Sequence, residues 1–279
     1  MSARDTGIIG WPVAQSLSPV IHAYWRAKHA ITGDYRLFPI DPAHFAEQLK
    51  TVKTRSVRGF NVTVPHKETI IPFLDTVDDA ARHIGAVNTV VRDGATWRGT
   101  NTDAYGFITH LKEQVGDLQP YIDKVVVLGA GGAARAVIVA LQEAGARQMV
   151  ITNRTKPTAD MLAAEFGVKA AAWEEKENQL QAAGLLVNTT VLGMKGKPPL
   201  EIDIKNLPPA AAVYDIVYAP LETELLKKAK ATGRRPVDGL GMLLYQAQRA
   251  FQEWHGVLPA VDDGLRTAVL AEIKKRGNP

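Results

Sequence analysis

The chain of 279 residues contains no cysteine. It therefore offers no disulfide, no thiolate nucleophile and no thiolate ligand for a metal ion. Its seven histidines form no HxxxH or HExxH pair, so we expect no bound metal. Basic residues also lack the dense runs, interleaved with aromatic residues, that are typical of nucleic-acid surfaces. We expect no nucleic-acid partner.

Long apolar runs are absent as well. No stretch approaches the ~18 uninterrupted apolar residues of a membrane-spanning helix, and the start MSARDTGIIG lacks an apolar signal region. We therefore expect a cytoplasmic protein with no membrane partner. A content of 46% hydrophobic and 22% charged residues is typical of a globular protein with one large or two ordinary domains. The formal charge of +4 is compatible with anionic substrates and cofactors.

Segments with strand and helix patterns alternate along the chain. The first hundred residues predict an α/β region, with strands at 6–9, 35–40 and 87–91 and helices at 19–29 and 42–52. From about residue 121 a second region predicts strands at 124–128, 149–152, 185–188 and 213–217, with helices between them. This alternation predicts parallel βαβ crossovers and a doubly wound sheet. A helical pattern returns from Gly239, and a last helix is predicted at 263–275.

The segment GFNVTVPHK, residues 59–67, combines a polar strand face with a lysine. Asn61 and Thr63 lie two apart in an extended run, so both point to one face of a strand. The apolar residues of the segment bury the other face: Phe60, Val62 and Val64. Pro65 ends the strand and suits a first helical turn, which places Lys67 near a helix start. Amide and hydroxyl groups beside one proton-transfer residue suit a polyhydroxylated molecule.

A glycine-rich turn follows the predicted strand 124–128. Its pattern, Gly129-x-Gly131-x-x-Ala134, is the G-x-G-x-x-A form of the dinucleotide fingerprint. The preceding strand and the following helix supply the required context, and the helix start offers N–H groups to a pyrophosphate. The residues expected to approach the dinucleotide are Gly129, Ala130, Gly131, Gly132 and Ala133.

The next predicted strand ends in NRTK, where a chain built for NAD usually carries an acidic residue. Arg154 can stack on adenine and face a 2′-phosphate. Asn153, Thr155 and Lys156 offer further hydrogen-bond donors around it. We therefore expect NADP as the cofactor.

Seven motifs occur in an order that resembles the shikimate dehydrogenase family. They are SLSP, NVTVPHK, GAVNT, NTD, GAGGAARA, NRT and GMLLYQA, and they extend from Ser16 to Gln246. Each motif alone is of modest specificity. Ser18, for example, lies before Pro19 and also fits a simple helix cap.

The resemblance implies roles for individual residues. The catalytic pair would be Lys67 and Asp103, a coupled unit for proton transfer. Ser16 and Ser18 would hold the substrate carboxylate at a helix start. The further substrate-binding residues would be Asn61, Thr63, Asn88, Tyr218 and Gln246. Near the nicotinamide, the implied cofactor-binding residues are Thr189, Thr190, Ile216, Gly239 and Met242.

The resemblance also implies three parts of the chain. Residues 1–103 would form an α/β substrate-binding domain, 104–238 a Rossmann-type NADP-binding domain, and 239–279 helices that return to the first domain. The implied reaction is the reversible NADPH-dependent reduction of 3-dehydroshikimate to shikimate, in aromatic amino-acid biosynthesis. A homodimer is compatible with this family.

Three alternatives remain open at this point. One is a quinate/shikimate dehydrogenase that uses NAD, and another is an enzyme acting on an aminoshikimate. Related NADP enzymes often have a second basic residue where this chain has Thr158, so a weaker NADP preference also stays open. The third alternative, from a different class, is a catalytically silent binding protein of the same fold.

Overall fold

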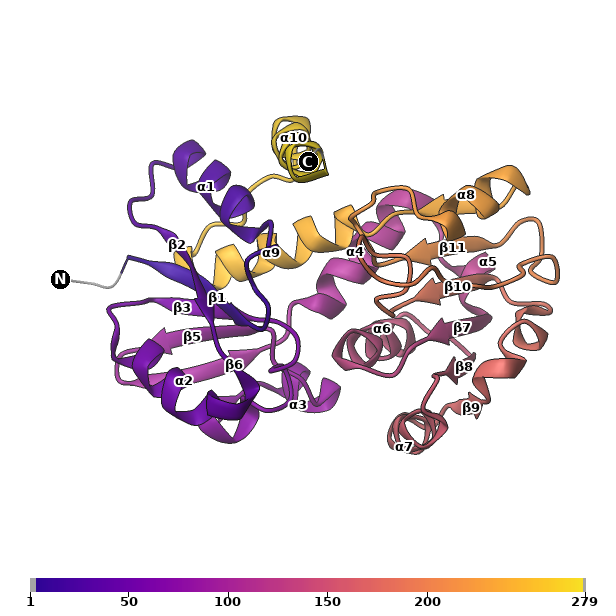
Figure 1. Ribbon diagram of the computed structural model, residues 1–279, viewed down its shortest axis with the longest axis horizontal. Helices are drawn as coiled ribbons and strands as arrows, with labels where there is room; N and C mark the ends of the chain where they lie inside the picture. The colour runs from indigo at the N-terminus through magenta and orange to yellow at the C-terminus, as the bar shows by residue number, and fades with distance from the viewer. Residues whose placement is uncertain (1–3, 278–279) are drawn as a thin grey trace. The chain divides into compact units, whose positions relative to one another are not determined.

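The computed structural model describes residues 4–277. The chain divides into two compact units. The first contains the residues up to Thr102 and those from Leu244 onward, and the second is the continuous stretch Asp103–Leu243. Figure 1 labels their helices and strands.

A mixed six-stranded sheet forms the centre of the first unit, in the order β2-β1-β3-β5-β6-β4. The strands are β1 (Thr6–Gly10), β2 (Tyr35–Pro39), β3 (Gly59–Val62), β4 (Thr76–Val77), β5 (Thr89–Asp93) and β6 (Thr96–Thr100). β1 pairs in parallel with β2 and β3, whereas β5 is antiparallel to β3 and β6. The expected α/β class is confirmed, and the β5–β6 hairpin was not predicted.

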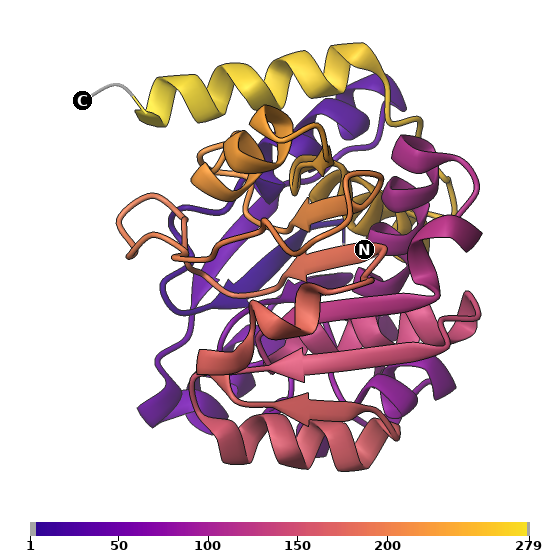
Figure 2. The same cartoon turned by 90° about the vertical axis from the view of Figure 1, so that its right-hand side faces the viewer.

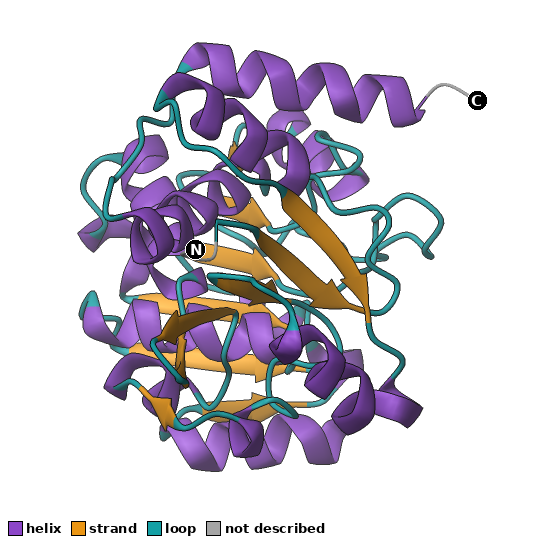
Figure 3. Cartoon of the chain, turned by 90° about the vertical axis from the view of Figure 1, so that its left-hand side faces the viewer, coloured by secondary structure: helices purple, strands orange, loops and turns teal. Residues whose placement is uncertain are grey.

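Helices cover this sheet from both faces (Figure 3). The elements of the first unit are α1 (Ser18–Lys28), η1 (Pro42–His44), α2 (Phe45–Thr54), η2 (Ile71–Phe73), α3 (Asp79–Ile84), α9 (Leu240–His255), whose residues from Leu244 belong here, and α10 (Asp263–Gly277). Val90 of β5 faces a core that includes Leu49 of α2. Its neighbour Val91 points the other way and packs on Trp254 of α9. The C-terminal helices therefore return to the N-terminal sheet, as expected.

The second unit contains a fully parallel sheet in the order β12-β11-β10-β7-β8-β9 (Figure 2). Its strands are β7 (Lys124–Leu128), β8 (Gln148–Thr152), β9 (Lys169–Ala171), β10 (Leu185–Asn188), β11 (Ala212–Asp215) and β12 (Arg235–Val237). Its helices are α4 (Asp103–Val115), α5 (Gln119–Ile122), α6 (Gly132–Glu143), α7 (Lys156–Phe166), η3 (Trp173–Glu175), η4 (Asn178–Leu180) and α8 (Glu224–Ala231). The strand order reverses beside β7, which lies between β8 and β10. The predicted doubly wound sheet is confirmed, and such a switch point is where open α/β sheets bind ligands.

The segment after β3 differs from the prediction. The strand ends at Val62, the Val64–Pro65 peptide bond is cis, and Val64 is 64% exposed rather than buried. Pro65 does not begin a helix: the His66 N–H donates to the Thr63 carbonyl at 3.0 Å, which closes a turn. The His66 ring is buried, and its Nε2 donates to the Ile40 carbonyl at 2.7 Å, which anchors this turn to the end of β2.

The start of α1 also differs. Ser18 is the first residue of the helix, and the preceding Leu17 makes no side-chain cap. Ser16 takes over part of the capping role, because its Oγ accepts a hydrogen bond from the Ser18 N–H at 3.2 Å. Between residues 4 and 277, no helix combines the length and apolarity needed to cross a bilayer.

Candidate active site

Asn61 of β3 is the centre of a buried polar group in the first unit. Its Oδ1 accepts a hydrogen bond from the Tyr35 hydroxyl at 2.7 Å. Its Nδ2 donates to the Asn88 carbonyl at 3.2 Å and to Thr89 Oγ1 at 3.1 Å. The side chain is only 4% exposed, so these partners hold the amide in one orientation.

Asn88, just before β5, continues this polar group. Its Oδ1 accepts from the Thr102 N–H at 2.8 Å and from the Thr89 hydroxyl at 3.0 Å. Its Nδ2 donates to Thr102 Oγ1 at 2.9 Å and approaches Gln246 Oε1 of α9 at 3.4 Å. The structure thus brings together the three predicted carboxamides Asn61, Asn88 and Gln246, although they are far apart in sequence.

The two predicted serines lie at the beginning of α1. Ser18 is buried, and Ser16 precedes it in a loop. The Arg276 guanidinium of α10 donates to the carbonyls of Gln15 and Ser16 at 2.9 and 3.2 Å. The C-terminal helix therefore holds the main chain of the serine loop in place.

Thr63 and Lys67 lie on the turn after β3. A Cβ placed on Gly10 would meet Thr63 Cγ2 at 2.4 Å, so glycine at the end of β1 makes room for the threonine. Lys67 is half-buried, and its carbonyl accepts from the Val87 N–H at 2.8 Å. The lysine side chain therefore projects from a backbone that is fixed on both sides.

Asp103 is buried at the first position of α4, in the second unit. It directly follows Thr102, whose N–H is bound by Asn88. The predicted catalytic aspartate is therefore the next residue along the chain from the polar group around Asn88.

The glycine turn of the second unit joins β7 to α6. Gly129 has a positive φ of 105°, and a Cβ there would lie 2.6 Å from Thr189 Oγ1, so both conformation and space require glycine. A Cβ on Gly131 would meet nothing within 4 Å. Nothing in the described chain thus requires glycine at 131, whereas close approach of a phosphate to the backbone does. Ala134 is fully buried, which lets helix and strand pack.

The basic turn after β8 presents Arg154 as an exposed side chain. Asn153 Nδ2 donates to the Thr155 carbonyl at 3.1 Å, which closes the turn. Lys156 begins α7 and forms an ion pair with Asp160, one helical turn further on. Within this turn, Arg154 is therefore better placed than Lys156 to meet a phosphate.

A buried network that sequence reasoning missed supports the neighbouring loops. Asp215, at the end of β11, is fully buried and accepts from Asn188 Nδ2 at 2.9 Å, from the Thr223 hydroxyl at 2.7 Å and from the Val217 N–H at 3.1 Å. Asn188 Oδ1 accepts in turn from the Thr190 hydroxyl at 2.7 Å. Burial raises the pKa of the Asp215 carboxyl to about 6, although these hydrogen bonds lower it. The sequence did offer a signal for this network, because Asn188 and Asp215 are polar residues at the ends of two apolar strands.

The remaining predicted cofactor residues lie on the loops that this network supports and at the start of α9. Thr189 Oγ1 donates to the Leu128 carbonyl at 2.7 Å, which ties the loop after β10 to the end of β7. A Cβ on Gly239 would lie 2.2 Å from the Ile216 carbonyl oxygen, so glycine permits close backbone contact. Met242 is buried, and Tyr218 is partly exposed on the loop after β11.

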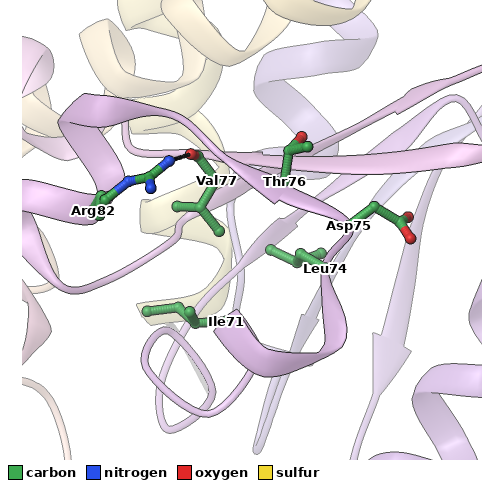
Figure 4. A pocket seen from close by; sticks show the side chains of 6 residues that line it. All are labelled: Ile71, Leu74, Asp75, Thr76, Val77 and Arg82. Atoms are coloured by element: carbon green, nitrogen blue, oxygen red, sulfur yellow. Dashed lines mark hydrogen bonds between the residues drawn. The ribbon is translucent and has the colours of Figure 1, made fainter.

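A surface pocket of about 420 Å³ lies elsewhere on the first unit (Figure 4). It is lined by Ile71, Leu74, Asp75, Thr76, Val77 and Arg82. The Arg82 guanidinium donates to the Val77 carbonyl at 2.6 Å, which uses one of its donors. None of the predicted site residues lines this pocket, so its chemistry is separate from theirs.

The second unit has a parallel sheet with a glycine turn at its switch point, which is typical of dinucleotide binding. The first unit has three carboxamides and a lysine. Together these features define a dinucleotide-dependent oxidoreductase. Family models match three parts of the chain: the shikimate dehydrogenase substrate binding domain at 8–90, shikimate / quinate 5-dehydrogenase at 111–192, and the shikimate 5′-dehydrogenase C-terminal domain at 239–268. The chain belongs to the shikimate dehydrogenase family.

Relatives and solved structures agree with this membership. Shikimate dehydrogenase (NADP(+)) of Methylobacterium radiotolerans is 48% identical over 272 residues, 95% of this chain and 96% of the relative. The structure of shikimate 5-dehydrogenase from Thermus thermophilus with NADP(H) and shikimate is 39% identical, with a TM-score of 0.86 over 96% of this chain and 98% of that chain. Quinate dehydrogenase from Corynebacterium glutamicum with NAD is 32% identical, with a TM-score of 0.87 over 96% and 99%.

Proposed function

We propose that this protein is an NADP-dependent shikimate dehydrogenase, which reversibly reduces 3-dehydroshikimate to shikimate in aromatic amino-acid biosynthesis. The observation that carries the proposal is the row of carboxamides Asn61, Asn88 and Gln246, which hydrogen bonds bring together in a chain of this family. Such a row offers several hydrogen bonds to a ring with several hydroxyl groups.

The substrate would bind the first unit. Ser16 and Ser18 would bind its carboxylate, aided by the start of α1. Asn61, Thr63, Asn88 and Gln246 would bind its hydroxyls. Tyr218 stays a predicted substrate-binding residue. The predicted domains are 1–103 for the substrate, 104–238 for NADP and 239–279 for the helices that complete the first. They differ from the compact units at Asp103 and at residues 239–243, which belong to the second unit.

The second unit would bind NADP. The open space before Gly131 and the start of α6 fit the pyrophosphate, with Gly129, Ala130, Gly132 and Ala133 around it. Arg154 would face the 2′-phosphate, with Asn153, Thr155 and Lys156 nearby. The network of Asp215 would hold Thr189, Thr190 and Ile216 near the nicotinamide end, with Gly239 and Met242. When bound, the nicotinamide supplies the hydride.

Proton transfer falls to Lys67. During reduction its ammonium would give a proton to the carbonyl oxygen that becomes the new hydroxyl, and its charge would stabilise the developing oxyanion. During oxidation the neutral amine would take that proton back. Asp103 would hold a substrate hydroxyl and share the proton with Lys67 as a coupled pair. The row of carboxamides would contribute by orienting the substrate for the reaction.

The test is the absorbance of the reduced-nicotinamide band, with shikimate or quinate crossed with NADP or NAD. Rapid reduction of NADP with shikimate is the expected result. Faster reaction of quinate with NAD would indicate the quinate dehydrogenase alternative. A folded protein that binds NADP but reacts in no combination would be the silent binding protein.

The cytoplasmic location and the homodimer remain predictions. Size-exclusion chromatography with light scattering tests the second. A single species with the mass of one chain would contradict it.

A further inference from the structure

Tyr35, at the start of β2, lies near two groups of the proposed substrate site. Its hydroxyl donates to Asn61 Oδ1 at 2.7 Å, and the Ser18 side chain lies near enough to oppose the rise that burial causes in the pKa of the phenol. Ser18 lies on α1 and Asn61 on β3, so the phenol lies near both the proposed carboxylate end and the proposed hydroxyl-binding end of the site. The sequence motifs named above do not include this tyrosine.

The chemistry of the partners sets the direction of these hydrogen bonds. The Asn88 carbonyl can only accept, so the amide that faces it must be Nδ2 of Asn61. Oδ1 therefore faces Tyr35 and must receive the phenol's single hydrogen. The phenol oxygen is left with its lone pairs and can act towards any other neighbour only as an acceptor.

This direction has a consequence for Asn61. Both hydrogens of its Nδ2 are used, one on the Asn88 carbonyl and one on Thr89 Oγ1. What Asn61 can still offer is a lone pair on Oδ1. The group that meets it must be a donor, such as a hydroxyl, and a carboxylate or ketone oxygen would be rejected.

His22 holds the ring of Tyr35 in place. The two rings are stacked, with centroids 4.3 Å apart and an angle of 3° between their planes. His22 is fully buried, and neither of its ring nitrogens has a hydrogen-bond partner among the described residues. Burial lowers the pKa of His22 well below 6.5, helped by the charges of His255 and Arg26, so the ring stays neutral. It therefore acts as a flat platform that does not compete for the phenol hydrogen.

We propose that Tyr35 is a positioning residue for the substrate: its hydroxyl donates to Asn61 and so fixes this amide as a hydrogen-bond acceptor for a substrate hydroxyl. This inference rests on the proposed function.

The experiment compares Tyr35→Phe with the wild type in steady-state oxidation of shikimate by NADP. Phenylalanine keeps the stack on His22 and removes only the hydroxyl. KM for shikimate rises about tenfold, the size expected for a lost hydrogen bond, while kcat falls less than about threefold and KM for NADP is unchanged. Tyr24→Phe is the matched control, because its hydroxyl donates to Asp262 at 2.9 Å in the same unit, away from this group.

A double-mutant cycle with Asn61→Ala shows whether Tyr35 acts through Asn61. In the Asn61→Ala background, Tyr35→Phe raises KM for shikimate no further. An equal tenfold rise in both backgrounds would overturn the inference, as would an unchanged KM in Tyr35→Phe or a parallel rise in KM for NADP.

The wild type separates failure of this inference from failure of the proposed function. If the wild type does not reduce NADP with shikimate, the proposed function is wrong. The same cycle is then measured on the denaturation midpoint, where a Tyr35–Asn61 hydrogen bond makes the two substitutions non-additive. Additive midpoints would overturn the inference.

Discussion

Lys67 owes its position to its main chain. Its carbonyl is bound by Val87, and the residue before it is anchored through the His66 ring to Ile40. Neither contact involves the lysine side chain. These main-chain hydrogen bonds remain when the ammonium is removed, so we expect them to hold the turn after β3 in a variant without it.

We predict that Lys67→Ala lowers kcat by ~10²–10⁴, the usual contribution of a positioned proton-transfer group. The Kd for NADP, measured by calorimetric titration, should not change, because NADP is assigned to the second unit. Lys50→Ala, at an exposed position of α2, is the control and should react like the wild type. Near-normal turnover of Lys67→Ala would remove the lysine from the mechanism.

Arg154 should set the choice between NADP and NAD. We predict that Arg154→Ala lowers the ratio of kcat/KM for NADP to that for NAD by roughly 10–100-fold, because one charge-assisted hydrogen bond contributes ~1.5–3 kcal/mol. Lys156→Ala should have a smaller effect, since its ammonium already pairs with Asp160. A larger effect of Lys156→Ala would reverse the two assignments.

At the scale of elements, the β7–α6 turn contains two glycines with different duties. We predict that Gly129→Ala destabilises the fold by about 1–2 kcal/mol or more, because φ is positive and Thr189 fills the space. Gly131→Ala should unfold like the wild type but raise the Kd for NADP about tenfold, a cost of ~1.4 kcal/mol, since its Cβ would enter the phosphate space. Urea denaturation and calorimetric titration measure the two effects. Equal NADP affinity of Gly131→Ala and the wild type would place the pyrophosphate elsewhere.

The elements that could be predicted from sequence are those whose residues carry their own signal. The central strands β7 and β10 are short apolar runs between turns, and the prediction gave their bounds without error. The short edge strands β4, β9 and β12 were missed because only pairing with a neighbour defines them. The hairpin between β5 and β6 was missed although Asp93–Gly94 is a turn signal.

The candidate site shows the same division. Motif residues such as Asn61 and Asn88 could be named from sequence, and the structure brings them together. Tyr35 and Asp215 were not named, because their importance lies in partners 26 and 27 positions away, respectively. Hydrogen bonds between segments distant in sequence produce no periodic pattern in the sequence, so they could not be predicted from it.

At the scale of the whole molecule, the free energy of unfolding should depend on pH through buried histidines and a buried aspartate, which act in opposite directions. Burial lowers the pKa of His22, and lowers that of His255 to about 4. In the unfolded chain both titrate near 6.5, so acid favours unfolding. Their contribution to the free energy of unfolding falls as the pH drops below 6.5, and that of His255 is lost by about pH 4. Asp215 acts in the opposite direction. Its pKa is about 6 in the folded protein and 3.8 in the unfolded chain, so its contribution to the free energy of unfolding falls as the pH rises from about 4 to 6.

We therefore predict that Asp215→Asn makes stability rise more steeply from pH 4 to pH 6.5. The difference from the wild type should be on the order of 3 kcal/mol across this range, because two pKa units correspond to about that energy. Urea denaturation at several pH values is the measurement, with the exposed Asp123→Asn as the control. Parallel pH profiles of Asp215→Asn and the wild type would mean that the carboxyl is not protonated in this range.

The division of the chain also orders events during its synthesis. The second unit is one uninterrupted stretch, whereas the first needs residues from both ends of the chain. The Trp254 indole donates to the Val90 carbonyl at 2.9 Å, and α10 packs on α1, so the first unit is incomplete until the residues of α9 and α10 have been translated. Domains usually fold in the order in which they leave the ribosome. Here the nascent N-terminal sheet must wait, and the middle of the polypeptide can finish folding before its beginning.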